Sequence, residues 1–107
     1  MIPGTAPPLR RQPGSAAAPL VSVLLPCYNA QGSLDEALDS LSRQSLSLFE
    51  IVAVDDGSTD ATWERLLARH LGEPRLRPLR IQHAGIVGAL NAGLAVCRAP
   101  LIARMDA

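Results

Sequence analysis

The chain has 107 residues, of which 48% are hydrophobic and 19% are charged, a composition typical of one small folded domain. Ten arginines balance ten acidic residues, so the sequence lacks the positive charge that a nucleic-acid backbone attracts, and it has too few aromatic residues to stack on single strands. The chain contains no lysine, which excludes a Walker-type phosphate loop and Schiff-base chemistry.

The cysteines and the apolar segments of the sequence indicate the cellular compartment in which the chain is expected. Cys27 and Cys97 form no C-x-x-C pair, so the sequence predicts two free thiols rather than a zinc site or a redox dithiol. No apolar run approaches the roughly 18 residues that span a bilayer, and the N-terminus lacks the apolar stretch of a secretory signal. We therefore expect no membrane segment in this chain and a cytoplasmic location, in the cytosol or on the cytosolic face of a membrane.

Two regions differ in composition. Residues 1–18 are rich in proline, glycine, alanine and serine without any period that could bury a face, which predicts a disordered tail. Residues 19–107 carry the hydrophobic periodicity of a folded domain. Within it, residues 21–25 are nearly all apolar, as in a strand covered on both faces, and Pro26 is expected to end the hydrogen-bond ladder of this strand.

The loop after this strand leads into a helix. Tyr28 lies where a planar ligand could stack, but spacing alone favours stacking on a ligand and packing against the next helix equally. Ser33 and Glu36 form a capping-box pattern, which predicts a helix that begins at Leu34. The apolar stripe expected on this helix consists of Leu34, Ala37, Leu38 and Leu41.

A second strand, residues 49–54, ends at two adjacent carboxylates, Asp55 and Asp56. Strand, helix and strand in close succession predict a βαβ unit, in which the two strands are parallel. Asp60 or Thr59 is expected to cap a second helix. The stripe expected on that helix consists of Trp63, Leu66, Leu67, His70 and Leu71.

The remaining residues predict an edge strand, a third helix and another strand. Residues 73–82 alternate in polarity, and two prolines confine them to a sheet edge. Three side chains of this stretch are expected to point to solvent: Arg75, Arg77 and Arg80. Residues 86–99 predict the helix, and residues 101–105 predict the strand, which ends at Asp106.

Polar residues thus follow three of the predicted strands. Tyr28 follows the first, Asp55 and Asp56 follow the second, and Asp106 follows the last. In an open α/β sheet, ligands bind beyond the carboxyl ends of the strands. The carboxylates could hold a divalent metal, bind ribose hydroxyls or base N–H groups, or serve only as caps and turn formers. Their mutual repulsion favours a site that also holds a cation or hydrogen-bond donors.

Several ordered motifs, spread over residues 19–107, resemble those of one family. The similar segments are VSVLLPCYNA, SLDEALDSLSRQS, FEIVAVDDGSTDAT, HAGIVGALNAGL and PLIARMDA. Together they resemble the N-terminal half of an inverting family 2 glycosyltransferase with the GT-A fold. The resemblance implies an α/β, Rossmann-like architecture, with a mostly parallel sheet and flanking helices. It also implies transfer of a sugar from a UDP- or GDP-linked donor to the hydroxyl of an unknown acceptor.

The resemblance assigns roles to single residues. Those that it places in the nucleotide-sugar site are Pro26, Tyr28, Asp55, Asp56, Gly85, Asn91 and Asp106. Tyr28 would stack on the base, Asp56 would accept a hydrogen bond from a base N–H, and Asp55 would support the loop. Gly85 and Asn91 match a G-x-x-x-A-x-N segment near the ribose and the diphosphate.

Asp106 aligns with the first carboxylate of the family's DxD motif. A Mg²⁺ or Mn²⁺ ion, bound by Asp106 together with a downstream aspartate, would neutralise the departing diphosphate. An inverting transfer also needs a general base beside the acceptor, and the resemblance assigns none within this chain. We therefore expect a fragment, because the sequence stops at Ala107 before that second aspartate and the base, and we expect the fragment alone to lack transferase activity.

The sequence departs from the family pattern at two positions, and another class of function stays open. His83 stands where asparagine is frequent, and Leu90 stands where many members have a basic residue. The alternative is a non-catalytic α/β domain, either receiver-like or nucleotide-binding. The lack of lysine argues against a receiver domain, and a first turn of PCYNAQGS argues against the G-x-G-x-x-G dinucleotide motif.

Overall fold

The computed structural model describes residues 18–45 and 48–107, so the predicted tail lies outside the described residues except for Ala18. Strands and helices alternate along the described part of the chain. Their order is β1 (Val21–Cys27), α1 (Leu34–Ser42), β2 (Phe49–Asp55), α2 (Thr62–Gly72), β3 (Leu76–Arg80), α3 (Gly85–Leu94) and β4 (Leu101–Arg104). Within this part of the chain, no helix is long and apolar enough to cross a membrane.

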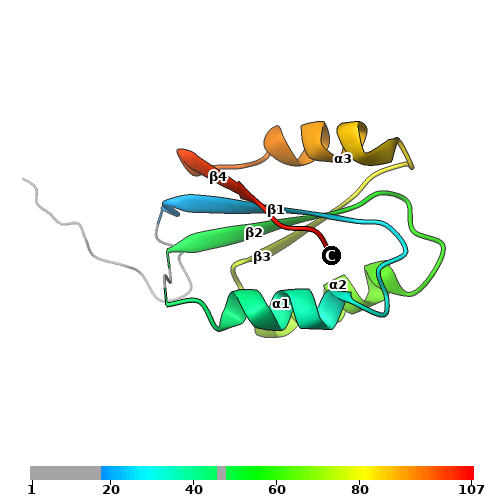
Figure 1. Ribbon diagram of the computed structural model, residues 1–107, viewed down its shortest axis with the longest axis horizontal. Helices are drawn as coiled ribbons and strands as arrows, with labels where there is room; N and C mark the ends of the chain where they lie inside the picture. Colours follow the sequence, from blue (N-terminus) through cyan, green and yellow to red (C-terminus); the bar gives the residue numbers. More distant parts are fainter. Residues whose placement is uncertain (1–17, 46–47) are drawn as a thin grey trace, which may run out of the picture.

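The strands form one parallel sheet in the order β3-β2-β1-β4. Helix α3 lies on one face of the sheet, and α1 and α2 lie on the other (Figure 1). The predicted α/β class, the parallel β1–β2 pair and the edge position of β3 are therefore confirmed. Because all four strands run in the same direction, their carboxyl ends meet at one edge, as a ligand site of this fold class requires.

The core has two layers, one on each face of the sheet. Side chains of β1 and β2 alternate between the layers, which is why both strands are apolar almost throughout. The layer under α1 and α2 contains the whole predicted stripe of α1, and Leu66 of α2 is fully buried there. The layer under α3 is smaller, and its buried members are Leu24, Val52, Val54 and Ala89.

The prediction that Pro26 ends the hydrogen-bond ladder is wrong on the β2 side of β1 and agrees with the structure on the β4 side. The strand continues to Cys27, and Pro26 lies opposite Val54 of β2. The Cys27 carbonyl accepts the N–H of Asp56 on the β2 side, and the Leu24 carbonyl accepts the N–H of Met105 on the β4 side. By alternation the Pro26 nitrogen faces the β4 side, where pairing ends at Leu24 and Arg104, so the ladder between β1 and β2 loses no bond to the proline.

Several details of the helices differ from expectation. The Ser33 side chain makes no capping hydrogen bond, and the Ala30 carbonyl instead accepts the N–H groups of Ser33 and Leu34 at 3.0 and 2.9 Å. Helix α2 starts at Thr62, and only part of its expected stripe is buried, since Leu71 is 87% exposed. Helix α3 ends at Leu94, five residues earlier than predicted.

A buried carboxylate explains why α3 ends early. Glu50 at the start of β2 is 2% exposed and accepts hydrogen bonds from Ser22, from Arg77 and from both the backbone and the side chain of Arg98. Arg77 also donates to the Val96 carbonyl at 2.8 Å, so the chain after α3 is drawn toward the sheet instead of continuing as helix. The prediction that Arg77 points to solvent is therefore wrong.

Candidate functional site

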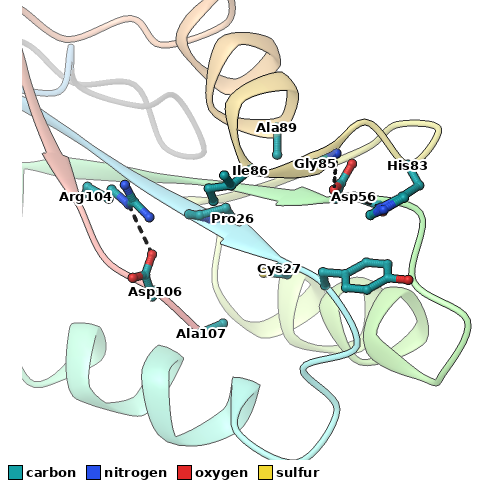
Figure 2. Close-up of a pocket in the computed structure, with 11 residues that line it drawn as sticks. Pro26, Cys27, Asp56, His83, Gly85, Ile86, Ala89, Arg104, Asp106 and Ala107 are labelled. Atoms are coloured by element: carbon teal, nitrogen blue, oxygen red, sulfur yellow. Dashed lines mark hydrogen bonds and ion pairs between the residues drawn. The ribbon is translucent and has the colours of Figure 1, made fainter.

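An open cavity of about 340 Å³ lies at the carboxyl edge of the sheet. Five of the residues expected at a site line it: Pro26, Tyr28, Asp56, Gly85 and Asp106. Figure 2 shows Pro26 from β1, Asp56 after β2, Gly85 at the start of α3 and Asp106 after β4 around this space. The structure thus brings together residues that are up to 80 positions apart, which is the arrangement that parallel strands permit.

Asp56 connects the end of β2 to the start of α3. Its carboxylate is buried; Oδ1 accepts the N–H of Ala84 at 2.7 Å, and Oδ2 accepts the N–H of Gly85 at 3.0 Å. Gly85 has φ +84°, a conformation that glycine adopts without strain. These bonds satisfy N–H groups that a helix start leaves without partners, and they place a negative charge where the helix dipole favours it.

His83 is a cavity residue to which sequence reasoning gave no role. Its Nδ1 lies 3.0 Å from the Asp56 carbonyl oxygen and 3.1 Å from Asp56 Oδ2. Its ring stacks on that of Tyr28, with centroids 4.5 Å apart and an interplanar angle of 29°. Its position after β3 could have identified it from the sequence, because the segment after β3 reaches the same edge of the sheet as the other site residues.

Asp55 and Asn91 do not line the cavity. Asp55 is fully buried, and its Oδ1 accepts the N–H of Ser58 at 3.2 Å. Its Oδ2 lies 3.4 Å from Arg80 Nε and has no hydrogen-bond partner among the described residues. Burial and, secondarily, the charge of Asp55 raise the pKa of the Cys27 thiol to about 12, so Cys27 is no nucleophile although it borders the cavity.

The residues after Asp56 hold the loop that carries Tyr28. The Asn29 N–H donates to Ser58 Oγ at 2.9 Å, and Asn29 Oδ1 accepts the N–H of Thr59 at 2.8 Å. The Ala30 N–H donates to Thr62 Oγ1 at 2.8 Å. The run GSTDAT, which the sequence presents as turn and cap chemistry, therefore joins the β1–α1 and β2–α2 loops and fixes the direction in which Tyr28 leaves β1.

Asp106 offers an exposed carboxylate, whose Oδ1 accepts a hydrogen bond from Arg104 Nε at 3.1 Å. A divalent cation such as Mg²⁺ or Mn²⁺ would need further oxygen ligands. Among residues 18–45 and 48–107, no group of three or more His, Cys, Asp or Glu side chains is placed to hold a metal ion. Asp106 therefore fits a metal as one member of a ligand set that the described residues do not complete.

Comparison with known proteins links this geometry to one family. The model of "Glycosyl transferase family 2" matches residues 22–107. Among curated proteins, the chain is 35% identical over 88 residues to the "Uncharacterized glycosyltransferase EpsJ" of Bacillus subtilis, covering 82% of this chain and 26% of that protein.

Two solved structures have the same fold. The mannosyltransferase PcManGT from Pyrobaculum calidifontis, in complex with GDP-Man and Mn²⁺, matches with a TM-score of 0.77 and 27% identity over 84% of this chain and 28% of its own. TarS from S. aureus, in complex with UDP-GlcNAc, matches with a TM-score of 0.73 and 28% identity over 80% of this chain and 26% of its own. The chain thus spans about a quarter of the length of these relatives.

Proposed function

The chain belongs to glycosyl transferase family 2, and from that premise we propose that its cavity is the nucleotide-binding part of an enzyme that transfers a sugar from a nucleotide-sugar donor to an acceptor hydroxyl. One observation carries the proposal. Tyr28, Asp56 and Asp106, which follow three different strands, line a single cavity at the carboxyl edge of the sheet. Two neighbours of the same fold are in complex with nucleotide sugars, one UDP-linked and one GDP-linked.

The proposed roles follow from the chemistry of each side chain. The half-exposed Tyr28 ring offers a face for the base, and Pro26 forms the wall beside it. Each Asp56 oxygen accepts one backbone N–H and has a second lone pair that can accept from a ligand donor, although the second lone pair of Oδ2 faces His83 Nδ1 at 3.1 Å in this structure. Gly85 brings the first turn of α3 against the cavity without a side chain in the way. Asp55 supports the loop from beneath, and Asn91 has no direct role in this proposal.

We also propose metal dependence and inversion at the anomeric carbon. Asp106 would supply one ligand to Mg²⁺ or Mn²⁺, and the metal, when bound, neutralises charge on the departing diphosphate. Mn²⁺ in the PcManGT complex supports this assignment. In an inverting transfer, the acceptor hydroxyl attacks from the side opposite the diphosphate and gives its proton to a base, which we assign to none of the cavity residues.

Nucleotide binding by the complete gene product tests the proposal. Isothermal titration with UDP, GDP and the corresponding diphosphate sugars, with and without Mn²⁺, should show metal-enhanced binding of at least one of them. Tyr28→Ala should weaken binding by about tenfold or more, the effect of one good stacking contact. Asp56→Ala should weaken it at least as much, because it removes a charged hydrogen-bond contact and also the two hydrogen bonds that hold the start of α3. Asp39→Ala, on α1, is the control for loss of an acidic side chain and should bind normally.

Binding that is unaffected by Mn²⁺ and by both site variants would contradict the proposal. Analysis of the reaction product then tests the proposed inversion and the proposed metal dependence. NMR of the transferred sugar reports inversion directly, and removal of metal by EDTA should abolish transfer until Mn²⁺ or Mg²⁺ is restored.

A further inference from the structure

We propose that the His83 imidazole occupies the place of the nucleobase while the site is empty, so that the base must displace it. This inference rests on the proposed function, because it assumes that Tyr28 and Asp56 recognise the base. It goes further by assigning to His83 a role in setting nucleotide affinity.

His83 makes both contacts that the base would need. Its ring stacks on Tyr28, with centroids 4.5 Å apart. Its Nδ1 faces two oxygen atoms of Asp56, the carbonyl at 3.0 Å and Oδ2 at 3.1 Å. Because both atoms are acceptors, Nδ1 carries the proton and donates. A planar ring with an N–H directed at Asp56 is also what uracil or guanine presents through its imino group.

The base and the His83 ring cannot occupy this position together. The 4.5 Å between the two ring centroids is the separation of a directly stacked pair. A base inserted between the rings would need about twice that distance. The face of Tyr28 toward His83 is therefore closed to a ligand until the imidazole moves.

The structure lets the side chain move while the backbone stays in place. The His83 side chain is about half exposed, so it can rotate toward solvent. Its backbone is confined on one side by Gly57, where an added Cβ would lie only 2.7 Å from the His83 nitrogen. On the other side, the next residue, Ala84, is bound through its N–H to Asp56. Displacement is thus a rotamer change that leaves the start of α3 intact.

The consequence is a reduced apparent affinity for the nucleotide. When only a fraction of the molecules has the imidazole turned out, the dissociation constant rises by the inverse of that fraction. Removing the imidazole should therefore tighten binding. If His83 instead supported Tyr28 from behind while the base took the opposite face of the ring, removing it would loosen binding, so the sign of the change separates the two arrangements.

The test is titration of the complete gene product with UDP and GDP. His83→Ala should bind its preferred nucleotide about three- to tenfold more tightly, the range expected for loss of one competing aromatic contact. His83→Phe keeps a stacking ring without the N–H and should lie between His83→Ala and the wild type. His70→Ala removes a histidine on α2 that bonds the Leu76 carbonyl, and it should leave the affinity unchanged. His83→Asn provides a second small replacement should the alanine variant fold poorly.

Two results would overturn the inference. If the wild type binds the nucleotide while His83→Ala and His83→Asn bind equally or more weakly, the inference fails and the proposed function stands. If neither the wild type nor any variant binds a nucleotide, the proposed function fails, and this inference fails with it.

Discussion

Asn29 and Ser58, 29 residues apart, join the loops after β1 and β2, with the Asn29 N–H donating to Ser58 Oγ at 2.9 Å. The Asn29 side chain returns a bond by accepting the N–H of Thr59. Asn29 itself has φ +49°, a left-handed conformation that asparagine tolerates better than most residues. The two loops therefore behave as one unit. The hydrogen bonds between them position Tyr28, which precedes Asn29, relative to Asp56, which precedes the Ser58 turn.

Thr62 should be the most sensitive member of this unit. Thr62→Val keeps the shape of the side chain but leaves the buried Ala30 N–H without its acceptor, which should lower the free energy of unfolding by about 1–3 kcal/mol. Chemical denaturation measures this loss, and amide exchange at Ala30 should become faster. Thr59→Val, which removes only an exposed hydroxyl that donates to Asn29 Oδ1 at 3.3 Å, is the comparison and should cost under about 0.5 kcal/mol. Equal losses in the two variants would contradict this account.

Glu50 should make the free energy of unfolding depend on pH in the acid range. Burial raises its pKa, but hydrogen bonds from Ser22, Arg98 and Arg77 outweigh burial and lower the pKa from 4.5 to about 2. The folded state thus binds this proton more weakly than the unfolded chain does, so the contribution of Glu50 is present above pH 4.5 and is lost as the pH falls toward 2.

Glu50→Gln should remove this pH dependence and should also lower the free energy of unfolding substantially. The loss at neutral pH should be about 2–3 kcal/mol, below the full value for a broken buried pair because both arginines are partly exposed. Denaturation at neutral pH and at about pH 3 measures both effects. Glu36→Gln, on the exposed side of α1, should change neither. A variant that loses stability in acid as steeply as the wild type would show that other groups are responsible.

Gly93→Ala should destabilise the packing of α3 on the sheet. A Cβ at this position would overlap the Leu24 side chain and lie 3.0 Å from Val54 Cγ2, so either the buried Leu24 side chain must change its rotamer or α3 must move away from the sheet. We expect a loss of about 1–3 kcal/mol in unfolding free energy. Gly72→Ala, at the end of α2 with open space around it, is the matched control and should be neutral or slightly stabilising. Similar losses in both variants would indicate backbone effects instead of packing.

Cys27 should resist alkylation in the folded protein. With its pKa raised to about 12, it has almost no thiolate at about pH 8.5, where an ordinary thiol is half ionised. Iodoacetamide followed by peptide mass spectrometry should therefore find Cys27 modified only after denaturation. Rapid modification of the native protein would show that the thiol is more accessible than its burial indicates.

The features that the sequence predicts well are those set by local periodicity. Apolar runs identified β1 and β2, the i, i+3, i+4 spacing identified the buried face of α1, and the two prolines after residue 73 identified β3 as an edge strand. Parallel pairing followed from the short crossover. The convergence of Tyr28, Asp56 and Asp106 on one edge could be predicted too, because it depends only on strand direction.

The rest depends on partners distant in sequence. Nothing near Glu50 indicates that Arg77 and Arg98, 27 and 48 positions away, will surround it and shorten α3. Ser58 and Thr62 look like turn and helix-start residues, although they bind the Asn29 loop. His83 enters the site only because β3 delivers it there, and its contact with Tyr28 spans 55 positions.

The two hydrogen bonds that the Asp56 carboxylate accepts from the N–H groups of Ala84 and Gly85 also limit how this site can evolve. A single carboxylate closes the first turn of α3 and faces the cavity, so a mutation that retunes ligand preference there also disturbs the helix. Divergence in specificity should therefore accumulate at neighbouring positions, His83 among them, while position 56 stays an aspartate.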